Sequence, residues 1–409
     1  MGFLSKKSVH ATNSIRELDG IAEKMRDGGR KITKLNIGDP AAYFPTPKYI
    51  IDAYVEALRE GRTSYSTSHG IKELTSAVSA RYKRMYNLDS SNEDIMVTQG
   101  VSEALMFLNS ALIDNGDMAI TFKPYYPEYL SHLKLNGGDM LFENYEESRG
   151  WKIDTDKLER SLAKMRSDGK IKKVKYMILA NPNNPTGTVL GRKILGEIAD
   201  LASEYGIFLI SDEIYDEIIY NGFKFTSMCE VAKGIPHMIL NGMSKDYDST
   251  GFRIGFMIIP EDDKKSAEFK RKMMDYSATR LSSNTPAEYA AAEALNNVAA
   301  HKRAVEKMVR EIEDRANHAV ERLAENRYIE VVRPNGAFYI LPRIDLKALG
   351  FGNDRDFIHT VLEKEGIQLT RGSGFGGPSH IRIVALPPKE ILDYAINRLN
   401  VFCKKRAGR

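Results

Sequence analysis

Cysteine is scarce in this chain, and its scarcity excludes a disulfide framework. Among 409 residues only Cys229 and Cys403 are cysteines, and their spacing matches neither a metal-ligating pair nor a redox pair. Such sparing use of cysteine is typical of proteins in a reducing compartment. We therefore expect a cytoplasmic protein with no structural disulfide and no metal site.

Long apolar runs and a strong charge of either sign are also missing. No apolar stretch approaches the roughly 20 residues that span a bilayer, and residues 1 to 7 lack the apolar core of a signal peptide. The net charge is only +4, and the basic clusters are short. These absences predict no membrane partner and no nucleic-acid partner.

What the chain does contain is a regular alternation of strand and helix patterns. Strands are predicted near 94–98, 118–122, 174–180, 207–211 and 237–240, and helices near 102–113, 154–166 and 191–205. This alternation predicts an α/β domain with a mostly parallel sheet flanked by helices, whose ligands bind at the carboxyl ends of the strands.

The patterns on either side of this region predict a second, smaller α+β domain. Before it we expect helices at 14–28 and 48–60 and a strand at 32–37; after it, helices at 261–276 and 287–326 and strands at 328–333 and 337–341. We therefore expect three parts: an N-terminal segment, 1–45, that joins the small domain; a large domain, 46–290; and a small C-terminal domain, 291–409.

Lys245 stands in a connection between two apolar strands, with Arg253 eight residues further on. Burial and a neighbouring cation lower the pKa of a lysine amine, and the neutral amine can form a Schiff base with an aldehyde. Taken alone, Lys245 is best interpreted as one more solvated cation among the 59 lysines and arginines. The surrounding residues decide between these interpretations.

The pattern formed by Ser244, Lys245, Gly251, Arg253 and Gly255 resembles the cofactor-lysine motif of fold-type I pyridoxal-phosphate aminotransferases. The other motifs of that family follow in its order over about residues 14 to 403. The resemblance implies a large domain that binds pyridoxal 5′-phosphate, with Lys245 as the catalytic residue that holds the cofactor covalently.

The same resemblance assigns further residues to the cofactor. Val101 and Ser102 begin a helix after a strand, where backbone N–H groups favour a phosphate, although Ser102 could simply cap the helix. The remaining residues implied to bind the cofactor are Tyr126 against the ring, Asn184 and Tyr215 at its phenolic oxygen, Asp212 at its nitrogen, Arg253 with the phosphate, Ser244 next to the cofactor lysine, and Tyr65 reaching the phosphate of the neighbouring subunit in a homodimer.

Arg382 is the candidate for binding the substrate carboxylate. It stands on an apolar strand, where a buried guanidinium needs an anionic partner, and a bidentate α-carboxylate suits it. The resemblance implies the same role and places Gly38 beside that carboxylate. Arg280 lies near the position where acidic-substrate aminotransferases keep an arginine, although an ion pair with a helix would explain it equally well.

The motifs together favour an aminotransferase of amino acid metabolism that works by a ping-pong mechanism. The segment from Arg371 to Gly376 looks most like the alanine aminotransferase branch, which implies alanine and 2-oxoglutarate as substrates. Aspartate or aromatic aminotransferases, C–S lyases and decarboxylases use the same cofactor on this fold and remain open. A non-enzymatic regulator is disfavoured, because only some forty residues precede the first motif.

Overall fold

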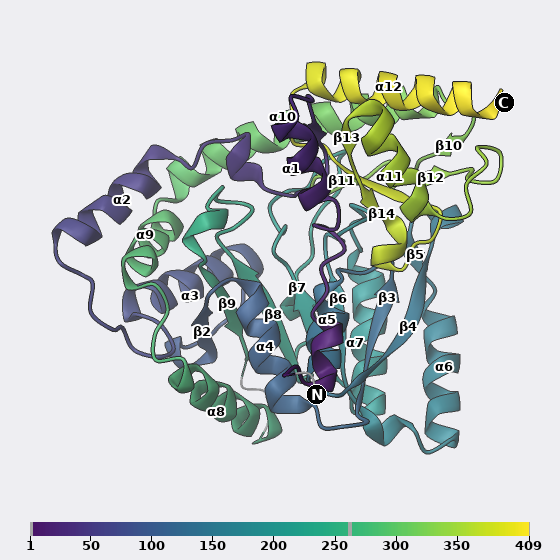
Figure 1. The fold of residues 1–409 in the computed structure, drawn as a ribbon. Helices are drawn as coiled ribbons and strands as arrows, with labels where there is room; N and C mark the ends of the chain where they lie inside the picture. Colours follow the sequence, from purple (N-terminus) through teal and green to yellow (C-terminus); the bar gives the residue numbers. More distant parts are fainter. Residues whose placement is uncertain (1–2, 261–263, 409) are drawn as a thin grey trace.

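An eight-stranded sheet forms the centre of the molecule (Figure 1), and the computed structural model describes residues 3–260 and 264–408. The pairs β8–β7, β7–β6, β6–β3 and β3–β4 are parallel, whereas β9 opposes both of its neighbours and β5 opposes β4. The predicted mostly parallel sheet is therefore confirmed. Across the sheet the strands are β2 (Ile95–Thr98), β9 (Gly255–Ile258), β8 (His237–Gly242), β7 (Phe208–Asp212), β6 (Val174–Ala180), β3 (Met118–Lys123), β4 (Asp139–Glu146) and β5 (Lys152–Ile153).

Helices cover both faces of this sheet, which explains why its central strands are so apolar. On β6, Met177 belongs to the core shared with α6 and α7, and Ile178 belongs to the core shared with α4, α5 and α8. Successive strand residues point to opposite faces, so both faces need apolar side chains. The helices of these two layers are α6 (Thr155–Ser167), α7 (Arg192–Tyr205), α4 (Val101–Leu112), α5 (Glu128–Leu135) and α8 (Lys264–Thr279).

A third group of helices packs beside β2 and β9 at the edge of the sheet. Leu74 and Val78 share a core with Ile95 of the sheet and with Ala290. The helices of this group are α2 (Lys48–Arg59), α3 (Lys72–Tyr86) and α9 (Thr285–Asn296). Asn297 then separates α9 from α10 (Val298–Ala324), the long helix that leads to the C-terminal part of the chain.

The N-terminal segment packs with the C-terminal part of the chain. Leu18 and Leu35 lie in one core with Ile312 and Phe357, and β1 (Thr33–Lys34) pairs in parallel with β13 (Ile367–Gln368). The domain boundaries near residues 45 and 290 stay a prediction. The remaining elements here are α1 (Asp19–Asp27), β10 (Ile329–Glu330), β11 (Tyr339–Ile340), β12 (Arg343–Ile344), α11 (Asp354–Glu365), β14 (Thr370–Arg371), β15 (Ile381–Val384) and α12 (Lys389–Ala407).

The structure differs from the predicted elements in several places. The helix predicted from residue 14 begins only at Asp19, because the Asn13 side chain accepts the Ile15 and Arg16 N–H groups in a turn. The strand predicted at 32–37 shrinks to β1, while α5, β4 and β5 were not predicted. Strand β4 was not predicted because its buried and exposed residues do not alternate regularly. Residues 261–263 of the helix predicted at 261–276 lie outside the described residues.

Within the described part of the chain, no helix is both long enough and apolar enough to cross a membrane.

Candidate active site

A cavity of about 700 Å³ opens where strands of the central sheet end, between that sheet and the C-terminal part of the chain. It collects residues that are far apart in the sequence, as ligand sites of open α/β sheets do. All predicted site residues except Tyr65 and Arg280 line it: Gly38, Val101, Ser102, Tyr126, Asn184, Asp212, Tyr215, Ser244, Lys245, Arg253 and Arg382.

The Lys245 amine projects into this cavity from the loop that follows β8. Its Nζ donates a hydrogen bond of 2.6 Å to the Gly38 carbonyl oxygen. Burial lowers the pKa of Lys245 to about 8; Asp39 opposes this shift, while Arg382 and Arg253 reinforce it. A lysine with such a pKa is neutral in an appreciable fraction near neutral pH, as a nucleophile or general base must be.

Asp212 ends β7 at the bottom of the cavity. One carboxylate oxygen accepts a bond of 2.7 Å from the Tyr129 hydroxyl, and the other accepts the Ile214 N–H at 3.3 Å. Burial raises the pKa of Asp212 to about 6, and these two bonds and the charge of Lys245 limit the rise. A buried carboxylate of this kind is suited to a cationic partner such as a protonated ring nitrogen.

Arg382 lies on β15 with its guanidinium between the rings of Tyr339 and Phe375, 4.6 Å from each centroid. It donates to the Asn184 side-chain oxygen at 3.0 Å and to the Asn36 carbonyl oxygen, but its buried Nε has no partner. Burial lowers the pKa of Arg382. A buried guanidinium with an unused N–H group is prepared for a carboxylate ligand.

The other end of the cavity is built for an anion. Helix α4 begins there at Val101, so its first N–H groups and its dipole face the cavity. Gly100 has a φ of 76°, and a side chain at this position would collide with the Arg253 guanidinium. Arg253 donates to the Thr250 and Gln99 carbonyl oxygens and keeps an exposed side chain. A phosphate fits between this helix and Arg253.

Two tyrosines of the cavity were not predicted as site residues. Tyr129 was expected to be a packing residue as readily as a site residue, yet it donates to Asp212. The Tyr339 hydroxyl lies 2.8 Å from that of Tyr215. Tyr129 lies in the first turn of α5, which was not predicted, so nothing in the sequence indicated that its hydroxyl reaches Asp212.

Tyr65 and Arg280 lie outside the cavity of this chain. The Tyr65 side chain is 80% exposed. Arg280 lies 3.1 Å from the Glu103 carboxylate and donates to the Ser68 and Val97 carbonyl oxygens. Arg280 was expected either to bind the side-chain carboxylate of an acidic substrate or to form an ion pair with a helix. Within one chain, its contact with Glu103 of α4 is such an ion pair.

A match to a family model identifies the family of the chain. The model of aminotransferase class I and II matches residues 30–399. The chain belongs to this family. It is therefore a pyridoxal-phosphate-dependent aminotransferase.

Individual aminotransferases agree with the family match along nearly the whole chain. The structure of an alanine aminotransferase from Pyrococcus furiosus superimposes with a TM-score of 0.93 at 34% identity, covering 98% of this chain and 100% of that one. An alanine aminotransferase of Mycobacterium tuberculosis is 32% identical over 93% of this chain and 87% of its own length. An aspartate aminotransferase of Bacillus subtilis is 30% identical over 94% and 95%. These names differ in their amino donor.

The residues present fit pyridoxal phosphate. The α4 N-terminus and Arg253 suit its phosphate, Asp212 suits its ring nitrogen, and Lys245 suits its aldehyde.

Proposed function

We propose that this aminotransferase transfers the amino group of L-alanine to 2-oxoglutarate. The observation that carries the proposal is a pair of apolar side chains in the cavity lining. Ile15 and Ile37 line the cavity, and Arg280, the one cation considered for an acidic side chain, is engaged with Glu103. A methyl group suits such a pocket, whereas a short carboxylate would lose its solvation there.

A cation at the mouth supports 2-oxoglutarate as the amino acceptor. Arg16 lines the cavity, and its side chain is 62% exposed with only a 3.4 Å contact to Asp19. A flexible arginine can meet the distal carboxylate of a longer substrate while the α-carboxylate binds Arg382. Next to Arg16, Glu17 fixes this segment by accepting bonds from Arg371 and Arg355.

Arg382 and Lys245 would divide the work on the substrate. Arg382 orients the amino acid through its α-carboxylate, which leaves the Cα–H bond facing the lysine amine. Lys245 then removes the Cα proton as a general base and later returns a proton as a general acid. Its pKa of about 8 lies close enough to neutrality for both steps.

Asp212 would support this proton transfer from the bottom of the site. When bound, pyridoxal phosphate supplies a ring that accepts the electron pair released from the Cα–H bond. The Asp212 carboxylate keeps a proton on the ring nitrogen, and the Tyr129 hydroxyl holds that carboxylate in place at 2.7 Å. Excluding water from this buried end strengthens the interaction.

A panel of amino donors tests the substrate assignment. With 2-oxoglutarate as acceptor, we expect kcat/KM to be higher for alanine than for aspartate or aromatic amino acids. If aspartate exceeds alanine by more than about tenfold, which is roughly 1.4 kcal/mol of transition-state preference, the assignment is wrong. Release of a thiol or of carbon dioxide from other donors would instead identify a C–S lyase or a decarboxylase.

The exposed position of Tyr65 supports a homodimer with shared sites. Its hydroxyl has no role in the cavity of its own chain, while Arg253 presents an exposed side chain to an incoming group. Subunits carrying Lys245→Ala can be mixed with subunits carrying Tyr65→Phe, provided that each homodimer is inactive. A site shared between subunits predicts recovered activity, because each hybrid then contains one intact site. Verified hybrids without activity would contradict the sharing.

A further inference from the structure

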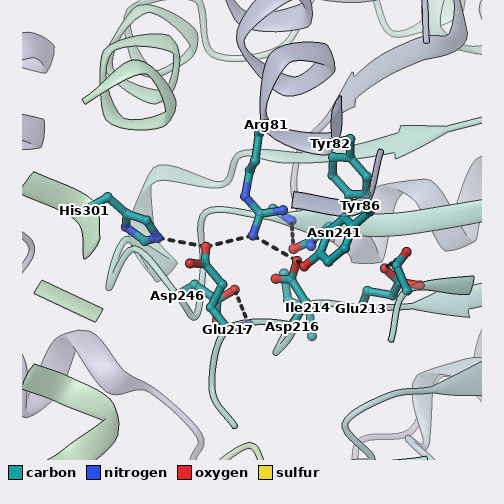
Figure 2. Close-up of polar contacts among 12 residues, drawn as sticks. Arg81, Tyr82, Tyr86, Glu213, Ile214, Asp216, Glu217, Asn241, Asp246 and His301 are labelled. Atoms are coloured by element: carbon teal, nitrogen blue, oxygen red, sulfur yellow. Dashed lines mark hydrogen bonds and ion pairs between the residues drawn. The ribbon is translucent and has the colours of Figure 1, made fainter. Parts of the chain in front are cut away.

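Behind the Lys245 loop, ionisable side chains from four parts of the chain meet in the interior (Figure 2). Arg81 comes from α3, Asp216 and Glu217 follow β7, Asp246 follows Lys245 directly, and His301 lies near the start of α10. We call these five residues the rear cluster. None of them is among the residues that line the active-site cavity.

Arg81 supplies the positive charge of the rear cluster. Its Nη2 donates to Asp216 at 2.9 Å and to Glu217 at 2.8 Å, and the arginine and Asp216 side chains are 2% and 0% exposed. The Tyr86 hydroxyl donates to the same Asp216 oxygen at 2.5 Å, and His301 Nε2 lies 2.8 Å from Glu217. Arg81 therefore provides a buried positive charge for two carboxylates at once.

Asp246 is the third carboxyl group of the rear cluster, and among the described residues no cation lies at ion-pair distance from it. Burial raises its pKa well above the usual range, and the neighbouring Asp216 raises it further through its charge and a hydrogen bond. Two adjacent carboxylates cannot both ionise in such an environment. The Asp246 carboxyl offers an oxygen within 4.8 Å of oxygens of Asp216 and Glu217, and a carboxyl group that holds a proton there can donate to Asp216.

The loop that carries Lys245 is held at two successive residues. The Asp246 carboxyl accepts the Glu217 N–H at 3.4 Å. The ring of Tyr247 stacks on His301 with centroids 3.9 Å apart and planes 13° apart. These contacts hold the backbone at the two residues that follow Lys245.

We propose that Asp246 is a positioning residue for Lys245, acting through a carboxyl group that links the lysine loop to Asp216 and to the Glu217 amide. Its role rests on the proposed role of Lys245, because the loop it fixes sets where the amine meets the cofactor. A displacement of about 1 Å at a reacting group is enough to slow a reaction about a hundredfold.

Two substitutions of Asp246 separate this role from simple core packing. Asp246→Asn keeps a neutral group that donates to Asp216 and accepts from Glu217. Asp246→Leu keeps a similar volume but makes neither bond. The first readout is the rate at which the cofactor-free protein forms its borohydride-reducible lysine adduct with added pyridoxal phosphate. The second is the division of any activity loss between kcat and KM for alanine.

We expect the asparagine variant to stay within about threefold of the wild type in both readouts. The leucine variant should form the adduct at least about tenfold more slowly and lose at least about tenfold in kcat, with the KM for alanine changed less than about twofold. The matched control is Asp94→Leu, which removes another buried carboxylate, paired with Lys270 at 2.7 Å on the edge of the sheet. It should lower the melting temperature without slowing adduct formation.

A folded leucine variant that forms the adduct at the wild-type rate would overturn the proposal, as would an asparagine variant as slow as the leucine variant. If the leucine variant does not fold, Asp246→Glu replaces it. The longer side chain should displace the loop and slow adduct formation, and a wild-type rate would again overturn the proposal. An adduct that persists in Lys245→Ala would refute the proposed function itself, whereas its loss there together with a normal Asp246→Leu refutes only the role of Asp246.

Discussion

Ionisable groups gather on both sides of the Lys245 loop, but the cations on the two sides have different partners. Behind the loop, Arg81 is paired with the carboxylates of Asp216 and Glu217. In front of it, the contacts described for Lys245, Arg253 and Arg382 run to carbonyl and amide oxygens, with no carboxylate at ion-pair distance among the described residues.

The absence of anionic partners on the cavity side, within the described part of the chain, indicates that an anionic ligand binds there. A buried cation that already has its anions stabilises the fold, and removing either partner leaves a costly unpaired charge. A buried cation without an anion costs stability until an anionic ligand arrives. The buried cations of the cavity therefore lower the stability of the cofactor-free protein and favour ligand binding. Removing a charged side chain should raise the free energy of unfolding on the cavity side of the loop and lower it in the rear cluster.

Lys245→Ala should have the largest effect on activity. Removing the amine removes both the attachment of the cofactor and the proposed general base, so transamination should fall more than about 10⁴-fold. The cofactor-free variant should unfold at the same or a higher denaturant concentration than the wild type, because a buried amine has been removed. A variant that retains even a hundredth of the wild-type kcat would contradict this role.

Asp212→Asn should reduce activity strongly and yet stabilise the cofactor-free protein. We expect kcat to fall by about 10²-fold or more, since an amide does not keep the ring nitrogen protonated. The pKa of Asp212 is raised to about 6, so the folded protein binds the extra proton between about pH 4 and 6 and loses stability as pH rises through that range.

The gain in stability from Asp212→Asn should accordingly be greatest above about pH 6, where the buried carboxylate is ionised, and should vanish toward pH 4. Urea unfolding of the cofactor-free wild type and variant across this range measures it. An equal difference at every pH would show that the Asp212 charge is not responsible.

Arg81→Met tests the opposite side of the loop. It leaves Asp216 and Glu217 buried without their cation, which should cost about 3 to 5 kcal/mol in the free energy of unfolding. Asp216→Asn combined with Arg81→Met should recover part of that loss, because one unpaired charge disappears. Denaturant unfolding curves of the single and double variants measure these changes in the free energy of unfolding. An Arg81→Met protein as stable as the wild type would show that the Arg81 ion pairs do not stabilise the fold.

Arg382→Lys should weaken substrate use more moderately. The lysine keeps the charge but loses the planar, bidentate geometry, so kcat/KM for alanine should fall about 10- to 150-fold, or about 1.5 to 3 kcal/mol. The loss should be similar for every amino acid, since all of them carry the α-carboxylate. A loss confined to one donor would place Arg382 at the substrate side chain instead.

The smallest effect is expected from Arg16→Ala. An exposed arginine contributes about 1 kcal/mol or less to binding a charged group, so the KM for 2-oxoglutarate should rise about fivefold. The KM for pyruvate in the reverse direction should stay unchanged, because pyruvate has no distal carboxylate. Steady-state kinetics with both oxo acids compares them, and equal changes for the two would exclude a role for Arg16 in selecting the longer acid.

The active site was more predictable from the sequence than the rear cluster, for a physical reason. Lys245, Asn184 and Asp212 stand where apolar strand patterns stop and loops begin, and strand ends of a parallel sheet converge on one edge. By contrast, Arg81 and His301 are charged or polar residues within helices, where solvent exposure is the ordinary expectation. Only the packing of α3 and α10 against the lysine loop buries them.

The elements that were not predicted also lack a clear local pattern in the sequence. Strand β4 near the sheet edge mixes buried and exposed residues without strict alternation, and α5 is a short helix in a segment dominated by tyrosine and proline. Because α5 was missed, the contact from Tyr129 to Asp212 could not be predicted. The contacts of Arg280 likewise depend on the fold of the segment at residues 65 to 70, which its sequence spacing does not reveal.

The assignment of Lys245 as the residue that holds the cofactor can be tested directly by borohydride reduction of the protein with pyridoxal phosphate bound, followed by proteolysis and mass spectrometry. We predict a single pyridoxyl group, on the peptide that contains Lys245, at close to one per chain. A pyridoxyl group on any other lysine, or a reduced protein without one, would contradict it.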